Sequence, residues 1–139
     1  MMDLKRRIAK DKSGVGAIEF AIAAPVLFAL IFGIWNTGLI LYADNSIRSA
    51  VETGARQATI FPRPTEAQIR QVINDRYYGP RMGAINGPTL AYTVQNGAPV
   101  VTITMSYTHE TVLPFLDVPP LLLQHQRTVY LAPTATSGS

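Results

Sequence analysis

A charge-free apolar run over residues 20–41 limits what this chain can fold into more than any other feature. As a helix rising about 1.5 Å per residue, the run reaches about 33 Å, close to the thickness of a hydrocarbon core, about 30 Å. Asn36 and Thr37 are its only clearly polar side chains. Its many Leu, Ile, Phe and Val side chains outweigh them in transfer free energy. The run therefore predicts one membrane-spanning segment over residues 20–42.

The charges before the run predict how the segment is oriented. Residues 1–14 hold five basic and two acidic side chains, a basic leader that favours a cytoplasmic amino end and a translocated carboxyl end. Residues 15–139 hold seven Arg and seven acidic side chains, so nothing there predicts a nucleic-acid partner. The chain has no Cys, which excludes disulfides and thiolate chemistry.

Glu19 is the feature that a simple anchor does not explain. It directly precedes the apolar run, and a carboxylate in a membrane segment is costly enough to be a functional-site hypothesis. A secretory signal would have an apolar region of about 7–15 residues and then a small-residue cleavage site, whereas this run is longer. A plain uncleaved anchor remains as an alternative.

The helical pattern continues beyond the apolar run. Charges of alternating sign recur every four residues, at Asp44, Arg48, Glu52 and Arg56. A second stripe is apolar: Ile47, Val51, Ala55 and Ala58. We therefore expect one long helix over residues 15–60, whose second half packs its apolar stripe on a domain. The charged stripe reads as a solvated face, or as a surface that selects neighbours in an assembly.

The remaining residues predict a small α+β domain over residues 61–133. Pro62 and Pro64 end the long helix, and Thr65 with Gln68 forms a capping-box pattern before a second helix near residues 66–77. Residues 79–88 read as a loop because they are rich in Gly and Pro. The polar tail, residues 134–139, is expected to be flexible.

Alternating side chains after residue 89 predict strands. Residues 90–95 and 101–108 have a period of two, and Asn96-Gly97 between them is a strong hairpin signal. Residues 127–131 can supply a third strand. We expect an antiparallel sheet of about three strands with the helices on one face.

An unusually apolar segment, residues 112–123, interrupts these strands and reads as a loop. Leu121, Leu122 and Leu123 are its most conspicuous side chains. The segment either closes the small core as a flap, or forms a patch that meets the membrane or another subunit. The sequence leaves both interpretations open.

No motif in the sequence predicts catalysis, a metal site or a cofactor. His109 and His125 lack the spacing and the neighbouring ligands of a metal site. Ser106 near His109 has no evident orienting acid, which makes a tethered hydrolase a remote alternative. No glycine motif that would cradle a phosphate is present, and no small-molecule substrate is expected.

The amino-terminal third of the chain resembles the TadE-like family, the minor pilins or pseudopilins of tight-adherence (Tad/Flp) systems related to type IV pili. The resemblance rests on five segments: GVGAIEF at residues 14–20, APVL at 24–27, FGI at 32–34, LYA at 41–43 and ETGAR at 52–56. It implies a pilin-like structural protein, and not an enzyme. The remainder of the chain matches only in its general order, a helix followed by a short sheet.

The resemblance also implies a processing site and partners. A prepilin peptidase would cut between Gly14 and Val15, which makes Glu19 the fifth residue and Phe20 the sixth of the mature chain. The new amine, with a pKa near 8, would lie about one helical turn from Glu19. Either that amine or one on a neighbouring subunit could neutralise Glu19.

The expected partners are the bacterial inner membrane, the peptidase, other pilins or pseudopilins and the Tad assembly platform. The protein would be a single-span precursor with a periplasmic domain, and would lie outside the cell once assembled into a pilus. The alternative from another class is an uncleaved anchor that carries a periplasmic interaction domain.

Overall fold

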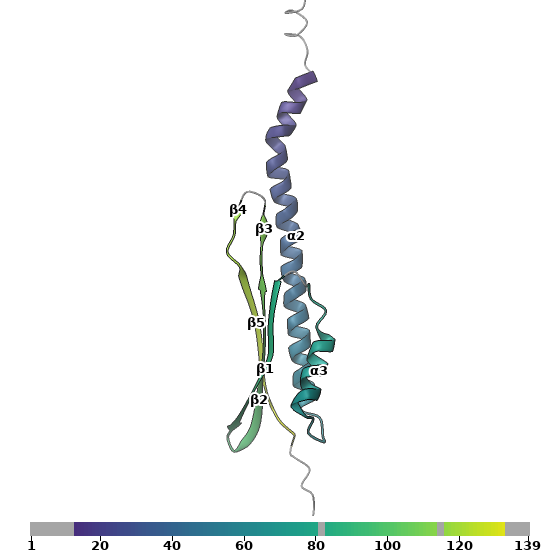
Figure 1. Cartoon of the computed structure of the whole chain (residues 1–139), viewed down its shortest axis with the longest axis vertical. Helices are drawn as coiled ribbons and strands as arrows, with labels where there is room; N and C mark the ends of the chain where they lie inside the picture. Colours follow the sequence, from purple (N-terminus) through teal and green to yellow (C-terminus); the bar gives the residue numbers. More distant parts are fainter. Residues whose placement is uncertain (1–12, 81–82, 114–115, 133–139) are drawn as a thin grey trace, which may run out of the picture.

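A long helix dominates the structure, a computed structural model that describes residues 13–80, 83–113 and 116–132. Helix α2 (Ser13–Ala58) has 46 residues, and its amino-terminal half extends beyond the rest of the molecule (Figure 1). The long helix predicted over residues 15–60 is confirmed. The leader before residue 13 and the tail after residue 132 lie outside the described residues.

A second helix, α3 (Glu66–Arg76), packs against the carboxyl-terminal half of α2. The predicted capping box is present: the Thr65 backbone N–H donates to Gln68 Oε1 at 2.9 Å, and the Gln68 N–H donates to Thr65 Oγ1 at 3.3 Å. These bonds satisfy donors that a helix start otherwise leaves unpaired, so they fix where α3 begins.

Three antiparallel strands form the main sheet in the order β1-β2-β5, with β1 at Gly83–Gln95, β2 at Ala98–His109 and β5 at Leu121–Tyr130. Asn96 and Gly97 turn the chain between β1 and β2 with positive φ values of 53° and 77°. This is the hairpin that the Asn-Gly pair predicts, because such turns need left-handed backbone. Two short strands, β3 (Val112–Leu113) and β4 (Leu116–Asp117), pair as a separate hairpin.

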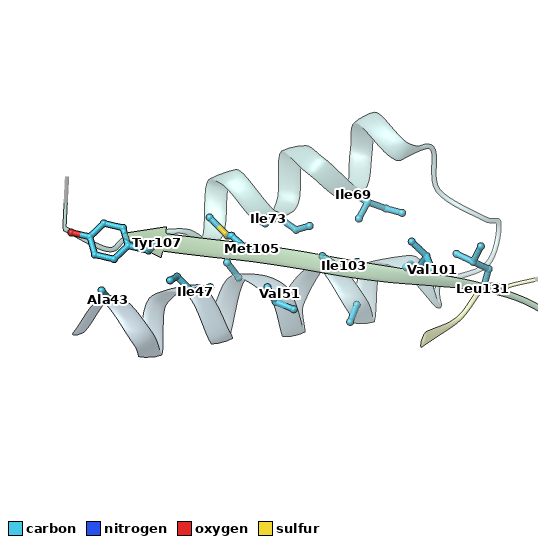
Figure 2. Close-up of a cluster of buried hydrophobic side chains, with 13 residues drawn as sticks. Ala43, Ile47, Val51, Ile69, Ile73, Val101, Ile103, Met105, Tyr107 and Leu131 are labelled. Carbon is cyan, nitrogen blue, oxygen red and sulfur yellow. The ribbon is translucent and has the colours of Figure 1, made fainter. Parts of the chain in front are cut away.

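The core lies between the helices and one face of the sheet (Figure 2). Alternate residues of β2 point into it, and the stripe predicted on the long helix is buried opposite them: Val101, Ile103, Met105 and Tyr107 from β2, and Ile47, Val51, Ala55 and Ala58 from α2. Ile69 and Ile73 of α3 complete the cluster. The predicted α+β fold, with helices on one face of a three-stranded sheet, is therefore confirmed.

Two segments predicted as loops are strands. Residues from Gly83 onward belong to β1, which pairs with β2 and shifts its register between Asn86 and Thr89, around the Gly87-Pro88 pair. Leu121, Leu122 and Leu123 begin β5 and pair with His109, Thr108 and Tyr107 of β2. In both cases the pairing partner is distant in sequence, and a local composition rich in Gly, Pro or Leu did not reveal it.

Candidate functional site

The amino-terminal half of α2 is an exposed apolar rod. Large apolar side chains before Asn36 lie on its surface, with Ile34 75% and Trp35 65% exposed, whereas Asn36 is only 8% exposed. The described residues contain one helix that is long and apolar enough to cross a membrane. Its most apolar 18-residue segment has a mean hydropathy of 2.3, and none of that segment is buried. Asn36 is therefore the first buried residue along α2, and most side chains of residues 14–35 face outward.

The predicted processing and assembly residues lie at the free end of this rod. Gly14 and Val15 are helical and exposed, and a methyl group added at Gly14 would meet no atom within 4 Å. Glu19 and Phe20 follow on the same exposed helix. Val15 and Glu19 are four residues apart, about one helical turn, so a charge on the backbone nitrogen of Val15 would be close to the carboxylate.

A shallow apolar groove runs along one side of the rod. Small residues open it: it is lined by Ala29, Leu30, Gly33, Ile34, Thr37, Gly38 and Leu41. A Cβ at Gly33 or Gly38 would meet nothing within 4 Å, so no other part of the described chain covers this side. Because glycine has no side chain, another backbone can approach this side of α2 closely.

A buried polar contact marks the point where the rod enters the domain. The Asn36 amide nitrogen donates to the Phe32 carbonyl at 2.9 Å, and Asn36 Oδ1 lies 3.4 Å from Nε2 of His109, a side chain that is 1% exposed. Nδ1 of His109 has no hydrogen-bond partner among the described atoms. The sequence predicted neither side of this contact, although a polar residue inside an apolar run was a signal that it needs a partner.

The charged stripe of α2 lies along the free edge of β5. Asp44 Oδ1 lies 2.8 Å from Nε2 of His125, and Arg48 pairs with Glu52 at 3.5 Å. Arg56 is exposed beside a groove that it lines together with Glu52 and Arg127. The stripe is thus one helix face, as predicted, but its first carboxylate is engaged within the chain, while Arg48 and Arg56 remain open to solvent.

Two further surfaces lie near the same junction. Tyr42 donates a 2.7 Å hydrogen bond to the Tyr78 carbonyl, and the two half-exposed rings lie 5.6 Å apart. Leu121 and Leu122 are 42% and 58% exposed, whereas Leu123 packs against the core. The predicted apolar patch therefore divides: Leu123 serves the core, and Leu121 and Leu122 remain available to a partner.

The side chains that could suggest hydrolysis do not come together. Ser106 and His109 are three positions apart on β2, so they lie on opposite faces of the strand. His109 is buried against Asn36, and His125 contacts Asp44. In the part of the chain that the structure describes, no three His, Asp or Glu side chains gather as metal ligands would.

Burial raises the pKa of three tyrosine hydroxyls in the domain. For Tyr107 the cause is first its burial and then the negative charge of Glu110. For Tyr77 it is burial followed by its tyrosine neighbours, and for Tyr92 burial followed by Glu66. Each hydroxyl therefore keeps its proton at neutral pH.

Comparison with known protein families matches most of α2. Residues 14–56 match a family model described as TadE-like protein. No match is found among curated proteins or among solved structures. The matched residues cover the exposed rod and most of the half of α2 that packs in the domain.

Proposed function

We propose that this chain, which matches the TadE-like family model over residues 14–56, is a structural minor pilin or pseudopilin of a Tad-type pilus. It is made as a single-span membrane precursor, cleaved after Gly14 by a prepilin peptidase, and assembled into a Tad/Flp-type pilus or used to prime one. The observation that carries this proposal is the exposed apolar rod of α2, which holds Glu19 as its one charged side chain.

The physical basis of assembly is exchange of apolar contacts. In the membrane, residues 14–35 contact lipid chains; in a filament, they contact the same rods of neighbouring subunits. Lipid tails are as apolar as leucine, so the gain comes from close packing and from paired polar groups. The groove at Gly33 and Gly38 favours close packing, and Glu19 supplies the polar group.

Cleavage gives Glu19 a partner. Cutting after Gly14 removes the basic leader and creates an amine at Val15, one turn from the Glu19 carboxylate. Two opposite charges in an apolar setting are more stable paired than apart. Pairing between subunits would also fix the axial position of each new subunit. The partners of this step are the inner membrane, the peptidase, the other pilins and the assembly platform.

Mass spectrometry of the protein extracted from membranes tests the proposal. In cells that contain the peptidase, we expect a mature chain that begins at Val15; an intact leader would overturn the proposal and favour the uncleaved anchor with a periplasmic interaction domain. Gly14→Val should block cleavage. Gly16→Val is the matched control, since neither glycine has an atom within 4 Å of an added methyl group.

A further inference from the structure

Leu121 and Leu122 lie level with the point where the rod leaves the domain. His109, which contacts Asn36, is paired with Leu121 across β2 and β5, and Thr108 is paired with Leu122. Trp35 is the neighbour of Asn36 along α2. A short series of contacts therefore places the two exposed leucines at the same height along the helix as the exposed indole of Trp35.

The hairpin of β3 and β4 lies at the same end of the domain. Figure 1 shows β3 and β4 rising past the main sheet alongside α2, and β3 contacts that helix. Asp117 ends β4, the second strand of this hairpin. Charges occur only at its base, where Glu110 and Asp117 are exposed.

Helix length sets the height of this end relative to a bilayer. Residues 14–35 reach about 33 Å, slightly more than the hydrocarbon core of about 30 Å. If they span the core, Trp35 lies at its outer boundary, the layer that indole rings prefer. Leu121 and Leu122 then lie in that layer too.

From this geometry we propose that the Leu121–Leu122 end of the domain docks on the bilayer surface, at the boundary of headgroups and acyl chains. The proposal rests on the membrane-spanning role of α2 within the proposed function. Lipid is the occupant because the two exposed leucines lie at the height at which the lipid-facing rod leaves the domain. Glu110 and Asp117 restrict it to the headgroup layer, since a carboxylate deeper in the core is costly. The protein thus contacts the membrane twice, through the rod and through the end of its sheet.

The composition of the chain permits a clean test. It has no Cys and one Trp, so a single introduced cysteine can carry a polarity-sensitive fluorophore while Trp35 reports its own depth. We would label Leu122→Cys, with Gln126→Cys as the control. Both positions are exposed on the same face of β5, and the control is about 13 Å farther along the strand. The full chain is placed at one copy per phosphatidylcholine nanodisc.

In these nanodiscs we expect the label at position 122 to emit at shorter wavelength than the label at 126. The label at position 122 should be quenched several-fold more than the label at 126 by lipids that carry a quencher near the headgroup. It should be quenched several-fold less than the label at 126 by iodide in the solvent. Equal behaviour at the two positions, with Trp35 still quenched by lipid, would overturn the docking and leave the membrane span intact. Failure of lipid to quench Trp35 would overturn the span itself. Shielding only in vesicles that hold many copies would identify a second chain as the occupant and overturn the lipid proposal.

Discussion

Asn36 of α2 and His109 of β2 meet inside the protein, 73 positions apart in sequence, with 3.4 Å between Oδ1 and Nε2. Because the Asn36 amide nitrogen donates to the Phe32 carbonyl, Oδ1 faces His109 as an acceptor, so this contact favours the tautomer in which Nε2 is the donor. This contact joins the apolar rod to the end of the central strand.

Asn36→Leu should lower the free energy of unfolding by about 1–3 kcal/mol, since it leaves a buried N–H unsatisfied. His109→Phe added to it should restore most of the loss, because two apolar partners of similar shape avoid that penalty. Thermal unfolding in detergent, followed by circular dichroism, measures both. Thr37→Val, at an exposed neighbouring position, is the control. Simple addition of the two single losses in the double variant would contradict the pairing.

Gly54→Ala should destabilise the domain although alanine is the better helix former. The added methyl group would lie 2.4 Å from Cγ1 and 2.6 Å from Cδ1 of Ile73, a fully buried side chain between α2 and α3. The cost of overpacking the core, about 1–3 kcal/mol, then exceeds the gain in helix propensity from glycine to alanine, about 0.5–1 kcal/mol.

Two further variants make the Gly54 prediction specific. Gly38→Ala, where the methyl group meets nothing within 4 Å, should be neutral or stabilising in the isolated chain. Ile73→Val combined with Gly54→Ala should recover part of the loss, because it removes Cδ1. If Gly54→Ala unfolds at the same temperature as the wild type, the close approach of α2 and α3 is not needed for stability.

Glu19→Gln should reduce incorporation into filaments to a trace while leaving membrane insertion and the domain unchanged. It leaves the amine of Val15 without a counter-charge in an apolar interface, a penalty of about 3–5 kcal/mol. Quantitative immunoblotting of sheared filaments against membranes measures the ratio. Glu66→Gln, a change in the exposed first turn of α3, should incorporate normally. Normal incorporation of Glu19→Gln would remove the proposed role of this carboxylate.

Stability should decline at alkaline pH, and Tyr107 should account for part of the decline. Burial raises the pKa of its hydroxyl above 10.0, so the folded state holds this proton more tightly than the unfolded state. The stabilisation is complete below about pH 10 and is lost as pH rises through the raised folded value. Tyr107→Phe should therefore flatten the pH dependence of the urea midpoint above about pH 10. Tyr130→Phe, at an exposed residue, is the control, and an equal slope in both variants would contradict the assignment.

The charged stripe of α2 should divide into two functions. Asp44→Asn breaks the contact with His125 and should cost less than about 1 kcal/mol, because both side chains are partly exposed. It should leave incorporation unchanged. Arg56→Gln should leave thermal unfolding unchanged and weaken incorporation, measured by the same immunoblot. A reversed pattern would show that the stripe selects neighbours through Asp44.

Local sequence patterns predicted the helices well because the residues that define a helix lie within one or two turns of one another. The bounds of α2 and α3, the capping box at Thr65 and the turn at Asn96-Gly97 all follow from residues close in sequence. The start of β1 at Gly83 did not, since its Gly and Pro residues resemble a loop. Its strand character comes from pairing with the end of β2.

The candidate site was predictable where chemistry was concentrated in one segment and unpredictable where it depended on distant contacts. Glu19 and the exposed rod follow from a charge beside an apolar run. The partners of Asn36 and Asp44 are His109 and His125, which are 73 and 81 positions away. Only the fold brings these pairs of side chains together. From the sequence alone, the two histidines suggested only a remote catalytic role.

Helix α2 passes from its outward-facing half into the core without a break at Asn36, where the domain begins to bury it. Its backbone hydrogen bonds run nearly parallel to the axis and transmit torque along it. Any rotation of the rod about that axis carries the sheet through the same angle. In a fibre, the packing of the rods at the centre would then set the direction in which each domain projects from the fibre axis.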